Sequence, residues 1–120
     1  YDTNGHYTTS LQRCNSNGTF STFQQVNSAY PYIQGHPLSS NANQAMNGYW
    51  YFYNFGDSTK YTYATGHTTS AHNNSQAVSE FGSIQYIKTR PVTKIKFKIG
   101  GGTTQFTDGS KITLYGIKEY

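Results

Sequence analysis

Charge is scarce in this sequence. Asp, Glu, Lys and Arg make up 12% of the 120 residues, with five acidic side chains against nine basic ones. The one cysteine, Cys14, excludes an intrachain disulfide and argues against a secreted scaffold built on disulfides. No apolar run approaches the roughly 18 residues that a membrane-spanning helix needs, and no signal peptide is visible. Insertion into a membrane is therefore not expected.

Aromatic and small polar residues fill the chain instead. Aromatic residues make up 17% of it, with 12 Tyr and 7 Phe, so the residue types that strands favour are abundant. Disordered segments, by contrast, are poor in aromatic residues. The composition predicts an all-β protein: an antiparallel β-sandwich or jelly roll of about seven or eight short strands, with little or no helix. The length predicts one domain over residues 1–120, and it is also compatible with the C-terminal or ordered part of a longer chain.

Alternation of apolar and polar residues, with turn signals between, places the expected strands. They cover residues 6–14, 19–26, 49–55, 60–64, 81–88, 93–99 and 111–118, with a short extended piece at 29–33. The first two strands, and the third with the fourth, are expected to form hairpins. Residues 38–48 fit a short helix or a loop equally well. Residues 65–79 contain almost nothing that drives burial, so they are expected to form a long polar loop.

The strand expected at 93–99 alternates most strictly. It places Ile95 and Phe97 on one face and Lys94 and Lys96 on the other, and the glycines that follow it lead into a closing hairpin with residues 111–118. The net charge of +4 is concentrated in this part of the chain. No nucleic-acid-binding motif accompanies the lysines, and lysine on the outer face of a strand discourages edge pairing. Nucleic acid is therefore not expected as a partner.

Residues 49–55 form the most aromatic stretch, with aromatic side chains on both faces of the expected strand. Such a strand is either central, with both faces covered, or presents an aromatic surface to a subunit or a sugar. In the sugar-binding interpretation, tyrosines stack on the sugar and residues of the polar loop supply hydrogen bonds. The candidate binding residues are Tyr49, Tyr51, Tyr53, His67, His72 and Asn73, with Tyr61 and Tyr63 as further platforms.

The sequence contains no recognisable set of catalytic residues. The carboxylates are scattered, and Asp57 and Asp108, the first to test in a hydrolase, have turn-forming roles beside glycine. The four histidines follow no metal-ligand spacing, although His67 and His72 share the polar loop. No nucleophile elbow and no phosphate-binding loop is present. We therefore expect no enzymatic activity, no metal and no cofactor.

The C-terminal end carries a distinctive order of residues: an alternating strand, a Gly-rich turn, Phe, Gly-Ser and Ile-x-Leu-Tyr-Gly-Ile. The matching residues are Phe106, Gly109, Ser110, Ile112, Leu114, Tyr115, Gly116 and Ile117. This order resembles the C-terminal signature of a family of tailed-bacteriophage virion proteins, which are β-sandwich modules of tail fibres and other exposed virion parts. The resemblance is strongest over residues 91–120. The signature contains no chemistry of its own, because it is a sheet-closing strand.

The resemblance implies a structural protein on the exposed surface of a virion, on a tail fibre or the capsid exterior. It further implies a homotrimer that contacts other virion proteins, with attachment to host surface polysaccharide as an added role. A capsid decoration protein is the alternative within that class. A stand-alone lectin-like carbohydrate-binding domain is the alternative outside it.

Overall fold

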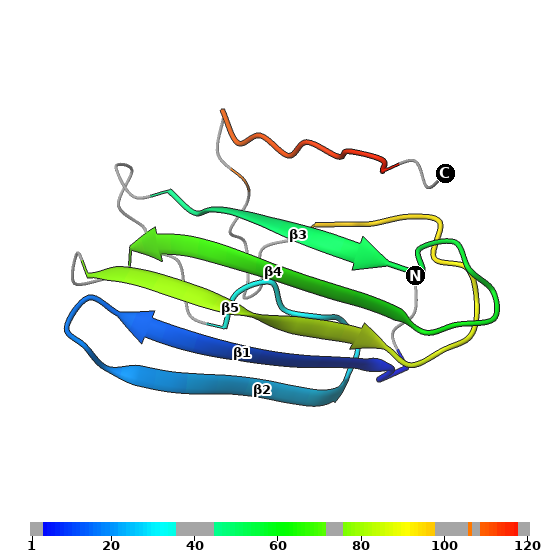
Figure 1. Ribbon diagram of the computed structural model, residues 1–120, viewed down its shortest axis with the longest axis horizontal. Helices are drawn as coiled ribbons and strands as arrows, with labels where there is room; N and C mark the ends of the chain where they lie inside the picture. Colours follow the sequence, from blue (N-terminus) through cyan, green and yellow to red (C-terminus); the bar gives the residue numbers. More distant parts are fainter. Residues whose placement is uncertain (1–3, 36–44, 72–75, 98–105, 107–108, 118–120) are drawn as a thin grey trace.

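The computed structural model describes residues 4–35, 45–71, 76–97, 106 and 109–117, and these contain strands but no helix. The all-β prediction is confirmed. Five strands form a single antiparallel sheet in the order β2-β1-β5-β4-β3 (Figure 1). The strands are β1 (Tyr7–Asn15), β2 (Phe20–Ser28), β3 (Asn47–Tyr53), β4 (Thr62–Ala71) and β5 (Ala77–Tyr86). Within the described residues, the strands are thus fewer than expected and form one sheet.

The hairpin of β1 and β2 is confirmed close to its predicted bounds. Its turn closes where the Asn15 amide donates to the Thr19 carbonyl at 3.0 Å and the Gly18 amide donates to the Asn15 carbonyl at 2.9 Å. Gly18 adopts a φ of +82°, which glycine reaches without steric cost. Further along, the register of the two strands shifts between Tyr7 and Thr9, opposite Asn27 with a φ of +53°. This β-bulge interrupts β2, which is an edge strand.

The hairpin of β3 and β4 is also confirmed. Its turn is held by the Asn54 side chain, whose Nδ2 donates to the Tyr61 carbonyl at 3.0 Å. The Asp57 carboxylate accepts from the backbone amide and the hydroxyl of Thr59, each at 2.7 Å. These two donors hold the pKa of Asp57 below its ordinary value, with a smaller contribution from nearby Lys60.

The prediction of a long polar loop at residues 65–79 is wrong. Strand β4 continues to Ala71 and β5 begins at Ala77, so most of this stretch lies in the sheet. Its residues are small and polar, and they are held by ladders on both sides: β4 pairs with β3 and β5, and β5 pairs with β4 and β1. Main-chain pairing between two neighbours replaces the apolar side chains that usually signal a strand.

The prediction of a closing hairpin between residues 93–99 and 111–118 is wrong over the described residues. Residues 91–97 and 109–117 belong to no strand of the structure. Alternation shows which side of a potential strand is apolar, but a strand also needs a neighbour, and here no described strand pairs with either segment. Residues 29–33 likewise form no strand, and most of the helix-or-loop stretch at 38–48 lies outside the described residues.

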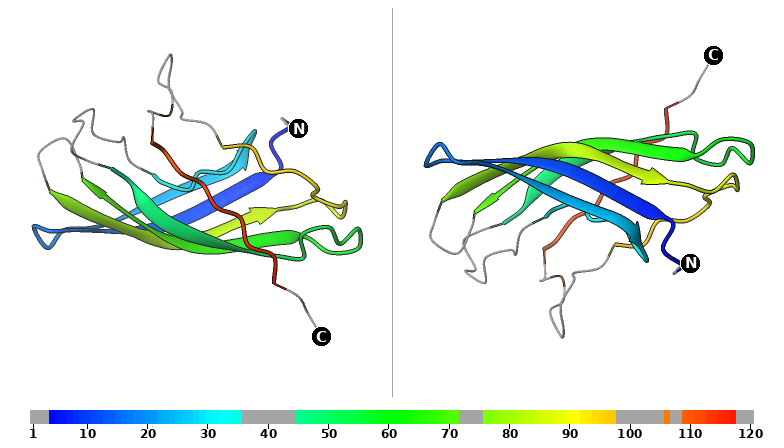
Figure 2. Two further views of the ribbon diagram at one scale, coloured as in Figure 1. Left: turned by 90° about the horizontal axis from the view of Figure 1, so that it is seen from above. Right: turned by 90° about the horizontal axis from the view of Figure 1, so that it is seen from below.

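One face of the sheet, which we call the covered face, holds the core. Its buried apolar side chains are Leu11, Ala64, Val78, Ile84 and Tyr86. Residues 29–35 and 87–97 lie on this side of the sheet (Figure 2). The Tyr32 amide donates to the Thr9 hydroxyl at 3.1 Å, and the Tyr32 ring contacts Phe23 edge to face. Partial burial, together with neighbouring Tyr30, raises the pKa of Tyr32.

Two glycines allow the strands of the covered face to approach closely. Gly82 of β5 lies opposite Leu11 of β1, and a Cβ built on it would stand 2.0 Å from the Ser10 carbonyl oxygen. Gly66 of β4 lies opposite Trp50 of β3, and a Cβ there would stand 2.4 Å from the indole ring. The indole therefore lies over the sheet in space that no other residue type would leave open.

Candidate binding face

The opposite face of the sheet, which we call the outer face, carries the candidate site. Alternation along each strand sends every second side chain to this face, and the ladders place those side chains in rows. One row runs Tyr51, Thr65 and Ser83 across β3, β4 and β5. The rows on either side are Tyr49, His67 and Phe81, and Tyr53, Tyr63 and Gln85. In both views of Figure 2, no described stretch lies over the middle of this face.

The outer face is hollowed between its larger side chains. Thr65 and Ser83 are small, whereas Tyr49, Tyr51 and Phe81 around them are large. The result is an open depression of about 640 Å³, which His67 also lines and beneath which lie Gly66 and Gly82. Its walls are aromatic and its floor bears hydroxyl groups.

The aromatic side chains of the outer face are half exposed and held in place by their neighbours. Tyr49 is 56% exposed and Phe81 49%. The Tyr49 ring meets Tyr51 edge to face at 5.4 Å between centroids and meets the His67 ring at 6.2 Å. Such contacts restrict the rings before any ligand arrives, which lowers the entropic cost of binding.

Polar groups around the depression are oriented by hydrogen bonds. His67 Nε2 and Ser79 Oγ lie 2.5 Å apart, and Gln85 Nε2 donates to the Tyr63 hydroxyl at 3.2 Å. A histidine beside a serine hydroxyl invites comparison with a catalytic pair, which needs a third group to orient the histidine. The carboxylates among the described residues are Asp57, in a hairpin turn, and Glu80, on the covered face. Neither can orient His67, so we assign no reaction to this pair.

The outer face lacks formal charge. The described strands contain two charged side chains, Arg13 and Glu80, and both lie on the covered face, where they pair with each other. On this face the described strands therefore offer aromatic rings, hydroxyls, amides and an imidazole, but no carboxylate, ammonium or guanidinium group. This chemistry suits a neutral ligand with hydroxyl groups better than an ion.

The structure brings together four of the six candidate binding residues: Tyr49, Tyr51, Tyr53 and His67 share the outer face. His72 and Asn73 lie outside the described residues. The aromatic stretch was expected either in a central strand covered on both faces or in a strand with an exposed aromatic surface. It forms β3, an edge strand whose tyrosines are exposed. Sequence reasoning missed the contribution of β5, namely Phe81, Ser83 and Gln85. Their alternation was visible, but nothing local shows that β5 lies beside β4.

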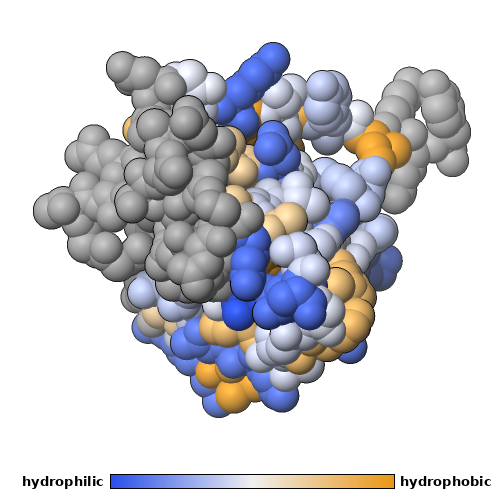
Figure 3. Space-filling model, turned by 90° about the vertical axis from the view of Figure 1, so that its left-hand side faces the viewer, coloured by the Kyte–Doolittle hydropathy of each residue, from blue (hydrophilic) through white to orange (hydrophobic). Residues whose placement is uncertain are grey.

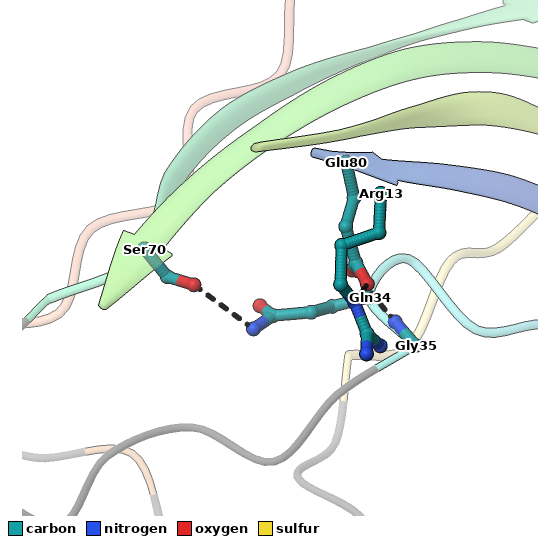
Figure 4. A network of polar contacts seen from close by, with 5 residues as sticks. All are labelled: Arg13, Gln34, Gly35, Ser70 and Glu80. Atoms are coloured by element: carbon teal, nitrogen blue, oxygen red, sulfur yellow. Dashed lines mark hydrogen bonds and ion pairs between the residues drawn. The ribbon is translucent and has the colours of Figure 1, made fainter. Parts of the chain in front are cut away.

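On the covered face, a partly buried polar network fixes the segment that covers the core (Figure 4). Arg13 Nε donates to Glu80 Oε1 at 2.8 Å, and the Gly35 amide donates to Glu80 Oε2 at 2.8 Å. The neighbouring Gln34 Nε2 donates to Ser70 Oγ at 3.2 Å. The network joins β1, β5 and β4 to residues 34–35, so its role is to hold that segment against the sheet.

The residues of the C-terminal signature belong to no strand of the described sheet. Ile112, Leu114, Tyr115 and Ile117 are all exposed, with Leu114 79% exposed. Gly109 adopts a φ of +88°, as a turn residue does, and Phe106 is also exposed. At the end of the molecule seen in Figure 3, hydrophilic and apolar residues are intermixed over the described surface.

No protein-family model, curated protein or solved structure matches this chain. The described residues contain no group of three or more His, Cys, Asp or Glu side chains placed to hold a metal ion. No helix among them is long and apolar enough to cross a membrane. The geometry of the outer face is therefore the main basis for a functional proposal.

Proposed function

We propose that this chain is a non-catalytic structural module of a tailed-phage virion that binds neutral surface glycans through its outer face. The observation that carries the binding role is the half-exposed, charge-free aromatic surface around Tyr49, Tyr51 and Phe81. The resemblance of the C-terminal residues supports the virion context. It implies a position on an exposed part, a tail fibre or the capsid exterior, among other virion proteins.

The physical fit between this face and a sugar is direct. A pyranose ring presents C–H groups on its flat sides and hydroxyls around its edge. Aromatic rings bury the flat side, while hydroxyl, amide and imidazole groups exchange hydrogen bonds with the edge. Tyr51 and Tyr49 supply the rings, and Ser83, His67 and Gln85 supply the polar groups. An anionic glycan would find no cationic side chain on the described part of this face.

The same proposal includes a β-sandwich. Residues 29–35 and 87–97 already lie over the covered face and begin a second layer (Figure 2). Two buried polar atoms on or beside the sheet, Trp50 Nε1 and Thr62 Oγ1, have no hydrogen-bond partner among the described residues. Buried polar groups in native proteins are generally satisfied. The missing hydrogen-bond partners of these two atoms support a more complete second layer in the assembled protein.

The binding role is tested by screening neutral and anionic oligosaccharides on an array and measuring Kd for the hits by calorimetry. A stacked ring contributes up to about 1.5 kcal/mol beyond the area it buries, so Tyr51→Ala should weaken binding about tenfold or more. Tyr51→Phe, which keeps the ring, should retain most of the affinity. Phe20→Ala removes an exposed aromatic residue from the other edge strand and should change nothing. Binding by no glycan, or equal loss in Tyr51→Ala and Phe20→Ala, would refute the proposal.

The virion context needs its own test. We would raise an antibody to this chain and perform immunogold electron microscopy on virus particles from its source. Label on tail fibres is the expected result. Label over the head would replace the fibre role with capsid decoration, and absence of label from all particles would leave a stand-alone lectin-like domain.

A further inference from the structure

The C-terminal segment, residues 111–117, has the pattern of a strand without a strand's neighbour. Ile112 and Leu114 would share one face, and Thr113, Tyr115 and Ile117 the other. Among the described residues this segment belongs to no ladder. Its apolar side chains are 56% to 83% exposed. Side chains of this kind favour burial, so the segment has both the sequence and the free surface to pair with another strand.

The sheet offers an edge that lacks the usual protection against pairing. Proteins guard exposed edge strands with charged residues, proline or β-bulges. Strand β3 contains none of these over its seven residues, which are Asn, Gly and five aromatic side chains. Strand β2, at the other edge, is also uncharged, but the β-bulge at Asn27 disrupts it. The open backbone of β3 is therefore the better acceptor.

We propose that residues 111–117 of one copy of this chain add to β3 of a second copy as a sixth strand, so that the protein is a homo-oligomer. The segment and β3 are equal in length. In this arrangement Ile112 and Leu114 extend the apolar side of β3, which carries Trp50 and Phe52, and Tyr115 extends the aromatic outer face. The inference does not rest on the glycan-binding proposal.

The direction of the chain favours a second copy over the segment's own sheet. Residues 109–117 run the same way as β3 in all views, so pairing within one chain would be parallel (Figures 1 and 2). Every pair in this sheet is antiparallel, and antiparallel pairing is slightly more stable per residue. A segment from another copy is free to approach β3 in the antiparallel direction. Because each copy contains a donor and an acceptor, exchange closes into a symmetric dimer or a ring.

The first test measures molar mass by light scattering across a range of protein concentrations. Thr113→Pro removes the backbone donor at the centre of the segment, whereas the matched control Thr113→Ser keeps it. We expect the unmodified chain and Thr113→Ser to be oligomers and Thr113→Pro to be a monomer with an unchanged circular dichroism spectrum of the sheet. An unmodified chain that remains monomeric at every concentration would overturn the proposal, as would assembly of Thr113→Pro at normal strength.

The second test identifies the acceptor. A nitroxide label is attached at Ser110→Cys in a Cys14→Ser background, and this chain is mixed with isotope-labelled, unmodified chain for NMR. We expect the label to broaden amide signals of β3 in the unmodified chain. Broadening of β2 signals instead, or no broadening of any signal in the isotope-labelled chain, would overturn the proposal. Thr113→Pro leaves the depression around Tyr51 intact, so glycan binding by that variant separates failure of this inference from failure of the proposed function.

Discussion

Removal of the Arg13 guanidinium is the most informative perturbation of this fold. The Glu80 side chain is 1% exposed and that of Arg13 22%. Arg13→Met keeps much of the apolar stem but removes the guanidinium that pairs with the buried Glu80 carboxylate, which also accepts from the Gly35 amide. Breaking a buried ion pair from one side costs about 3–5 kcal/mol, because the remaining charge is not compensated. We expect a loss of that size in the free energy of unfolding.

The opposite change should cost less. In Glu80→Leu the remaining guanidinium is partly exposed and can reach water, so the main loss is the acceptor of the Gly35 amide. An unsatisfied buried donor costs about 1–3 kcal/mol. The double variant Arg13→Met/Glu80→Leu should lose less than the two single variants added together, since it leaves no buried charge.

Urea unfolding followed by circular dichroism measures these differences, provided that the dependence of the free energy on urea stays constant among variants. Lys60→Met is the matched control, because Lys60 and Asp57 form an exposed pair at 3.5 Å in a turn. Its removal should have no measurable effect. A loss below about 1 kcal/mol in Arg13→Met would place the buried pair in the range of surface pairs. That result, or a larger loss in Glu80→Leu, would refute the reasoning.

Two further predictions concern the backbone and a turn. Gly82→Ala would place a Cβ 2.0 Å from the Ser10 carbonyl oxygen. We therefore expect the free energy of unfolding to fall by about 4 kcal/mol or more, or the variant not to fold. The control Gly116→Ala, with nothing within 4 Å of the new Cβ, should leave the Tm unchanged. An unaltered Tm in Gly82→Ala would contradict the strand packing. The pKa of Asp57, measured by NMR titration, should lie below its ordinary value, and Thr59→Ala should raise it. Because the pKa is lowered on folding, the stabilisation is present at neutral pH and is lost as the pH falls through the folded-state pKa. An unchanged pKa in Thr59→Ala would exclude the Thr59 hydroxyl as a cause, since the backbone amide of residue 59 remains.

Local signals predicted the two hairpins because their turns are encoded in adjacent residues. Asn15 and Gly18 bracket the first turn, and Asn54 and Gly56 begin the second, with both glycines and Asn54 at positive φ. By contrast, residues 65–79 gave no local sign of strand structure. They become strands because β5 is inserted between β1 and β4, and that pairing joins segments distant in the sequence. The order of the strands in the sheet likewise decides whether the alternating C-terminal segment, residues 111–117, pairs with a strand.

The candidate site was predictable to the extent that one strand carries it. Alternation showed that Tyr49, Tyr51 and Tyr53 share a face, and the structure confirms this. It could not show that Phe81 stands two strands away in the same row as Tyr49, because the row exists only once the strand order is known. Sequence patterns identify which residues share a face of a strand, whereas the neighbours of that strand are set by the whole sheet.

The few charged side chains of the described strands are placed away from the outer face and the edge strands of the sheet. Arg13 and Glu80 are the charged side chains of the five described strands, and they neutralise each other beneath the covering segment. Lysines that could protect an edge lie instead in the described segments outside the sheet, at Lys60, Lys88, Lys94, Lys96 and Lys111. A sheet with an uncharged outer face and an uncharged, aromatic edge is prone to association in water. In our two proposals both are occupied in the working protein, the face by a neutral glycan and the edge of β3 by a strand from a second copy.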